Sequence, residues 1–146
     1  MLDQPTDDAR AARERGILFD IGHGAGSFQY ERARNALASD FGPDSISTDL
    51  HTGSINGPVH DMTTTMAKML DLGMPLDEVI LRSTWEPAGM IGMRDVSGTL
   101  QVGREADIAV LRHAEREVTF TDSMGTSWDG RHVLTAEHTV RAGEIL

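Results

Sequence analysis

Two pairs of carboxylate and imidazole side chains stand where short strands are expected to end. Asp20 and His23 follow the apolar run at residues 17–19, and Asp49 and His51 follow a second short strand. In parallel α/β proteins, functional side chains gather at the C-terminal ends of strands. Carboxylate and imidazole groups bind divalent metals, and a carboxylate also accepts a proton from metal-bound water. These residues are therefore candidates for binding a metal and for accepting a proton.

Asp49 is the strongest of these candidates, because a strand opens there into a loop rich in glycine and asparagine. The alternative, that Asp49 caps a turn through nearby backbone amides, stays open. His51 would share a side with Asp49 if the strand extended that far; otherwise it is a solvated loop histidine. His23 lies among glycines and could reach a ligand, although the pattern alone favours a loop histidine bonded to a backbone carbonyl.

The glycine-rich loop around His23 raises a second class of function, a nucleotide-binding βαβ module. Glycines occupy the first, third and fifth positions of the run that starts at Gly22, whereas a dinucleotide fingerprint has glycine at the first, third and sixth. No lysine follows as in a phosphate-binding loop. The spacing therefore disfavours nucleotide binding.

The first two thirds of the chain have the pattern of an α/β protein. We expect a helix over residues 5–16, a buried strand over 17–19, a helix from Ser27 to Phe41 and a strand over 45–50. Connections this short predict a right-handed βαβ unit. Two more helices follow, the first capped by Asp61 and the second opened by Pro75.

The chain contains one lysine, Lys68, which the pattern places in a surface helix over residues 61–73. From Gly98 the pattern changes to short strands, expected near residues 98–103, 106–111, 118–121, 131–140 and 144–146. We therefore divide the chain into an α/β part, residues 1–95, and a β part, residues 96–146. His113, His132 and His138 lie in the expected strands without metal-ligand spacing.

Composition restricts the classes of partner. The formal net charge of −10 argues against nucleic acid and against an anionic membrane surface. The chain has no cysteine, which excludes disulfides, thiolate metal sites and a cysteine nucleophile. The N-terminal stretch is polar and no apolar run is long enough to cross a membrane, so we expect a cytoplasmic protein.

Several segments, in this order and spacing, resemble the amidohydrolase superfamily and most closely its dihydroorotase-like deacetylase group. They are DIGHGAGSF at residues 20–28, SISTDLH at 45–51, NGP at 56–58, STWEPA at 83–88 and GTLQVGREADIAV at 98–110. The resemblance runs from Gly16 onward. One departure is Glu86, where the family usually has asparagine.

The resemblance implies the C-terminal portion of a TIM (β/α)8 barrel, with residues 17–19 as strand seven and 46–48 as strand eight, followed by part of a small β-domain. It implies that Asp49 binds the catalytic metal and shuttles the proton of the hydrolytic water. His23 and His51 would lie near a small-molecule substrate. The implied cofactor is a divalent metal, zinc in our expectation.

The same resemblance shows what the chain lacks. The family's binuclear site also uses a His-x-His pair, a bridging lysine or glutamate and two further histidines, and this chain has no His-x-His pair. Protein zinc sites use three or four ligands. We therefore expect a truncated hydrolase of amide, cyclic amide or acetyl ester bonds that is inactive alone. The alternative is a non-catalytic remnant or assembly module of a split hydrolase.

Two strands cannot close a barrel, and their free edges tend to pair with another chain. The expected partner is thus a second copy of the chain or a complementing N-terminal fragment.

Overall fold

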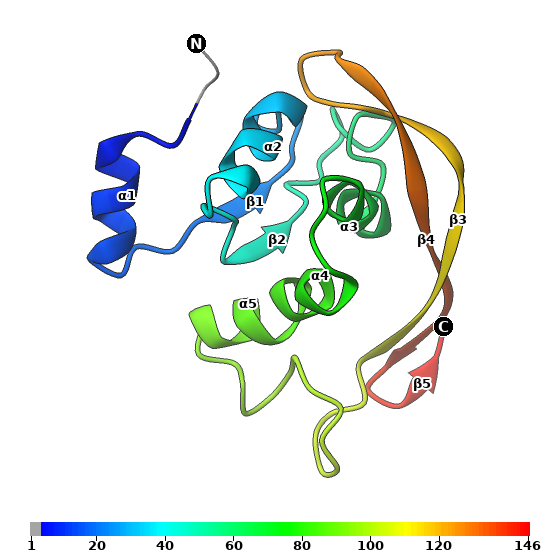
Figure 1. The fold of residues 1–146 in the computed structure, drawn as a ribbon. Coiled ribbons are helices and arrows are strands. Elements are labelled where there is room, and N and C mark those ends of the chain that lie inside the picture. The colour runs from blue at the N-terminus through cyan, green and yellow to red at the C-terminus, as the bar shows by residue number, and fades with distance from the viewer. Residues whose placement is uncertain (1–3) are drawn as a thin grey trace.

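A parallel pair of short strands and a long antiparallel ribbon form the two sheets of the protein (Figure 1). The structure, a computed structural model, describes residues 4–146. The parallel pair is β1 (Asp20–Gly22) with β2 (Ser45–Ser47). The ribbon is β3 (Ile108–Thr121), β4 (Ser127–Arg141) and the two-residue β5 (Glu144–Ile145). Helix α3 (Met62–Asp71) lies between these two sheets.

The βαβ unit expected from the sequence is present, with α2 (Tyr30–Ala38) connecting β1 to β2. The prediction of a buried strand over residues 17–19 was wrong. Pairing begins at Asp20, and the side chains of Ile17 and Leu18 are 53% and 55% exposed because no described segment covers them. The apolar residues 17–19 therefore precede the strand and are not part of it.

Strand β2 is also shorter than expected and ends at Ser47 rather than Leu50. Asp49 has a φ of 47°, in the left-handed region that an extended strand cannot include. Strand alternation therefore does not place Asp49 and His51 on one side.

Helix α1 (Asp7–Glu14) begins after Thr6, whose side chain accepts a hydrogen bond from the Ala9 amide. Helix α2 starts later than expected, and its N-cap position is Gln29 rather than Ser27. Its first amide, on Tyr30, donates instead to the Asp122 carboxylate at the tip of the ribbon, at 3.0 Å. The cap of α2 thus comes from a residue 92 positions away along the chain.

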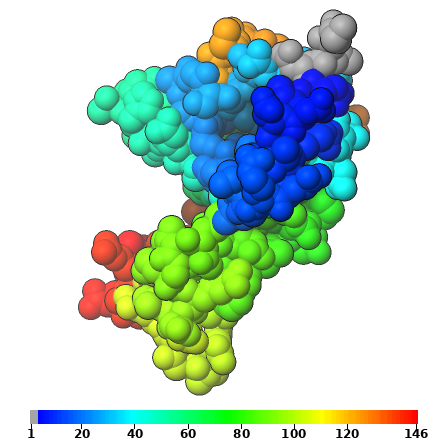
Figure 2. All heavy atoms as spheres, turned by 90° about the vertical axis from the view of Figure 1, so that its left-hand side faces the viewer, coloured from blue at the N-terminus to red at the C-terminus, as the bar shows by residue number. Residues whose placement is uncertain are grey.

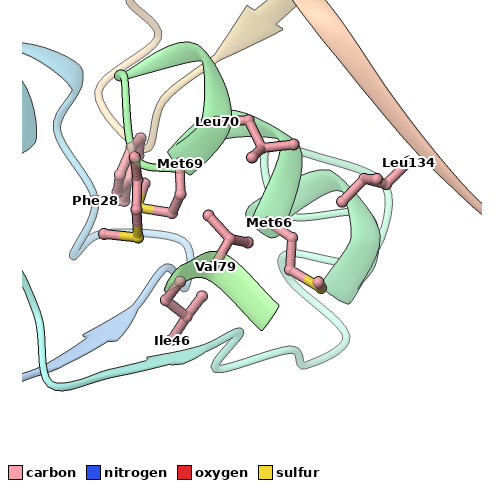
Figure 3. Close-up of a cluster of buried hydrophobic side chains, with 8 residues drawn as sticks. Phe28, Ile46, Met66, Met69, Leu70, Val79 and Leu134 are labelled. Atoms are coloured by element: carbon pink, nitrogen blue, oxygen red, sulfur yellow. The ribbon is translucent and has the colours of Figure 1, made fainter. Parts of the chain in front are cut away.

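Helix α3 carries the centre of the core. Asp61 caps it, as predicted, by accepting a bond from the Thr64 amide at 2.6 Å. The apolar side chains of α3 pack with residues from β2, α4 and β4 (Figure 3). The core cluster comprises Phe28, Ile46, Met66, Met69, Leu70, Met74, Val79 and Leu134.

The prediction that this is a surface helix was wrong. Every residue from Thr65 to Leu70 is buried, including Lys68, which is 1% exposed. The polar residues of α3 had predicted a side exposed to solvent, but strand β4 of the ribbon packs against the helix.

Two further helices, α4 (Leu76–Ser83) and α5 (Trp85–Met90), follow, and Pro75 precedes the first as expected. No strand forms over residues 98–103, which make turns instead. The stretches expected at 106–111 and 118–121 belong to one strand, β3, whose register with β4 shifts between Glu115 and Val118. Among the described residues, no helix is long and apolar enough to cross a membrane.

Candidate active site

The parallel pairing of β1 and β2 brings the two predicted site loops together. Gly22 is in register with Ser47, so both strands end at the same edge of the sheet. Just beyond the strand ends, the Gly24 amide donates to the Thr48 carbonyl at 2.8 Å. The glycine-rich loop of β1 therefore lies directly against the Asp49 loop of β2.

Asp49 and Gly24 fit one another closely. A Cβ atom on Gly24 would stand less than 3 Å from Oδ2 of Asp49, a separation that real Cβ atoms do not show. Both residues have positive φ, 51° for Gly24 and 47° for Asp49. Only glycine at position 24 leaves room for the Asp49 carboxylate in this position.

The Asp49 carboxylate itself is available for chemistry. The residue is exposed, and no hydrogen bond or ion pair within the described part of the chain involves its side-chain oxygens. An aspartate that only capped a turn would accept bonds from nearby amides, as Asp61 and Asp122 do.

His51 lies in the exposed loop that projects from the body of the molecule after β2 (Figure 2). Its ring Nδ1 accepts a bond from the Gly53 amide at 3.1 Å, and its own amide donates to Oγ of buried Ser54 at 3.0 Å. Nε2 faces no described partner, so His51 retains one nitrogen that could contact a ligand.

Asp20, by contrast, is used within the sheet. Its carboxylate accepts bonds from the hydroxyls of Ser45, at 2.6 Å, and of Ser47. These bonds tie the side chains of β1 to those of β2 across the parallel pair.

His23 is fully buried at 0% exposure, and its ring stacks on Phe28 with centroids 4.6 Å apart. Nδ1 lies 3.0 Å from the Gly24 carbonyl and Nε2 lies 2.8 Å from Nζ of Lys68. Burial lowers the pKa of His23 below its usual value; the Gly24 carbonyl opposes this shift and the Lys68 charge adds to it. Both ring nitrogens have partners within the chain, so neither is free to bind a substrate in this conformation.

Lys68 is the residue that sequence reasoning missed. Its ammonium donates to His23, to the Pro58 carbonyl at 2.7 Å and to the Thr121 carbonyl at 2.8 Å. Burial lowers its pKa to about 8, and the nearby negative charge of Asp122 opposes this shift. The sequence offered one indication of this role, because the single lysine of the chain lies among apolar residues of α3.

The described residues do not gather a metal site by themselves. No group of three histidine, aspartate or glutamate side chains lies close enough in this part of the chain to hold an ion. His113 and His132 face one another across the ribbon, with Nε2 and Nδ1 2.9 Å apart, and form a pair far from Asp49 in the sequence. Asp49 is thus a single candidate ligand, too few for a zinc site.

A family model described as the amidohydrolase family matches residues 11–135. The chain belongs to the amidohydrolase family. This membership confirms the resemblance seen in the sequence.

Two amidohydrolase relatives are named deacetylases. The protein from Enterococcus faecalis is 35% identical over 150 residues, which cover 99% of this chain and 40% of that protein. The protein from Agrobacterium fabrum is 44% identical over 110 residues, which cover 75% of this chain and 27% of that protein.

Two solved structures share the fold. One is of an adenine deaminase, with a TM-score of 0.94 and 35% identity over 99% of this chain and 39% of that one. The other is of a dihydroorotase, with a TM-score of 0.86 and 37% identity over 97% of this chain and 39% of that one. The chain therefore spans about two fifths of the length of these amidohydrolases.

Proposed function

We propose that the chain supplies the strand-end carboxylate Asp49 to a metal-dependent hydrolase of C–N bonds, with amides, cyclic amides or acetyl groups as the substrate class. The amidohydrolase match and the two deacetylase relatives support the class of reaction. The deaminase and dihydroorotase structures point to the same kind of bond. Asp49 accepts the proton of the attacking water, and His51 lies near the substrate.

One observation carries the proposal: Asp49 is exposed and without a partner in the described chain, at the C-terminal edge of a parallel strand pair. A carboxylate there is placed for chemistry rather than for holding a turn. The described residues alone do not hold a divalent metal. We therefore propose that the remaining metal ligands come from residues outside these 146.

The proposed architecture places β1 and β2 as the seventh and eighth strands of a TIM barrel, with the β3–β4 ribbon in the accompanying β-domain. Within the described residues, the parallel sheet consists of these two strands, so each has an edge without a neighbour. Such edges accept further strands. The segment that supplies those strands would also bring the missing metal ligands.

The test is to co-express the chain with the N-terminal portion of the Enterococcus faecalis deacetylase that the present chain does not match. We expect hydrolysis of N-acetylated amino acids or of dihydroorotate that depends on added zinc or manganese. Asp49→Asn should abolish this activity. Asp40→Asn is the matched control, because Asp40 is also exposed and also has a positive φ, 54°.

Two results would contradict the proposal. One is the absence of any metal-dependent hydrolysis by a complex that forms and is folded. The other is equal activity in the Asp49→Asn and Asp40→Asn variants. Either result would favour the alternative, a non-catalytic remnant or assembly module.

A further inference from the structure

We propose that Lys68 is a positioning residue for Asp49 and that it acts through the ring of His23. The catalytic consequence of this inference rests on the proposed function of Asp49, whereas the structural coupling can be tested on the chain itself. Lys68 and His23 are 45 positions apart in the sequence, and both are buried.

The coupling follows a short series of contacts. Nζ of Lys68 contacts Nε2 of His23 at 2.8 Å, and Nδ1 of His23 contacts the Gly24 carbonyl at 3.0 Å. The Gly24 amide donates to the Thr48 carbonyl at 2.8 Å. The Cα of Gly24 faces Oδ2 of Asp49 without room for a side chain between them.

The Lys68 ammonium and the Gly24 carbonyl together determine which nitrogen of His23 carries the proton. An ammonium group can only donate, so Nε2 must accept and the ring proton must sit on Nδ1. Nδ1–H then donates to the Gly24 carbonyl and fixes the orientation of that peptide. Gly24 keeps its φ of 51° in this arrangement, which is the conformation that accommodates Asp49.

The ammonium is held in one place by its other acceptors. It makes three hydrogen bonds, one for each of its protons, and the second and third go to Pro58 and Thr121. The rings of Phe28, Phe120 and Trp128 surround it, with Nζ 5.8 to 5.9 Å from each centroid. Lys68 therefore connects three segments by hydrogen bonds, namely the His23 loop, the loop before α3 and the end of β3.

A lysine that served packing alone would not need a defined ring tautomer on His23. The first measurement therefore uses the unsubstituted chain and long-range ¹H–¹⁵N NMR of its histidine rings near pH 7. We expect the proton of His23 on Nδ1 and a bare Nε2. A proton on Nε2 would overturn the inference without any variant.

The second measurement compares Lys68→Met with Met69→Leu. Met69 is equally buried in the same helix, so its substitution matches the perturbation of packing. With Lys68→Met the Gly24 carbonyl still accepts from Nδ1 of His23, but Nε2 loses its donor, so we expect the Gly24 amide to exchange about tenfold faster or more, as for a lost hydrogen bond to a charged group. Equal exchange at Gly24 in both variants would overturn the inference.

The catalytic consequence is tested in the complemented complex. Lys68→Met should lower kcat with little change in KM, because the substrate contacts remain while the carboxylate moves. If Asp49→Asn abolishes hydrolysis and Lys68→Met leaves kcat unchanged, the positioning inference fails alone. If Asp49→Asn has no effect, the proposed function fails, and the NMR result still decides the coupling.

Discussion

The Oδ2 atom of Asp49 stands next to the place where Gly24 lacks a side chain, closer than any Cβ could approach. This contact joins the ends of two strands that are separated in the sequence by helix α2. Glycine at position 24 leaves the room that the candidate base of the site occupies. The geometry of the carboxylate therefore depends on a residue that contributes no functional group.

Gly24→Ala should displace the Asp49 side chain and destabilise the protein by about 1–3 kcal/mol, because a positive φ disfavours alanine and the exposed carboxylate must move away from the added Cβ. Gly103→Ala is the control, since Gly103 also has a positive φ, 91°, and a Cβ there meets nothing within 4 Å. Urea denaturation of both variants measures the difference in unfolding free energy. Equal losses would show that the contact between Gly24 and Asp49 is not close in solution.

Lowering the pH should reduce the unfolding free energy, because buried His23 resists protonation in the folded chain. Burial holds its pKa below the usual value, so below about pH 6.5 the unfolded chain binds a proton that the folded chain does not. Stability should therefore fall with decreasing pH, by at most about 1.4 kcal/mol per pH unit from this group. The lowered pKa values of Asp61 and Asp122 matter only below about pH 4.

The measurement is the unfolding free energy at pH values from 4.5 to 7.5, for the unsubstituted chain and for His23→Gln. The slope assigned to His23 should disappear in the variant, whatever its absolute stability. An unchanged slope would mean that the pKa of His23 is the same in the folded and unfolded chains, which would contradict the prediction.

Raising the pH above about 8 should increase the stability of the fold through Lys68. Its pKa is about 8 in the folded protein, against an ordinary value of 10.5. Between these values the unfolded chain retains a proton that the folded chain has released, so stability should rise with pH across that window. Denaturation series from pH 7.5 to 10, with Lys68→Met as the reference, test this. A fall in stability confined to the lysine form would contradict it.

Asp122→Ala should cost about 2–4 kcal/mol, because one buried carboxylate accepts several amide bonds. The donors are the amides of Tyr30, Met124 and Thr126, so the substitution removes both the cap of α2 and the closure of the β3–β4 turn. Asp129→Ala on the exposed part of β4 is the control. Similar midpoints in urea for the two variants would refute this role.

The sequence predicted the parts of the fold that depend on neighbouring residues. The Asp61 cap of α3 follows from a short-range pattern and was confirmed. The proximity of the His23 and Asp49 loops was also predictable, because parallel strands end at one edge of a sheet.

The remaining features depend on contacts between distant segments. The burial of Lys68 requires a ribbon whose Thr121 lies 53 positions further along the chain, and no local pattern indicates that cover. The start of β1 depends on where β2 pairs with it, which displaced the strand from the apolar run to Asp20. The roles of Asp49, His23 and His51 stay predictions, as does the division at residue 95.

Lys68 is both the sole lysine of the chain and 1% exposed. Apart from the N-terminus, every amine-directed label or cross-linker must therefore wait for the fold to open before it can react. The rate of acylation at this single nitrogen would report how often the native state opens, without any engineered probe.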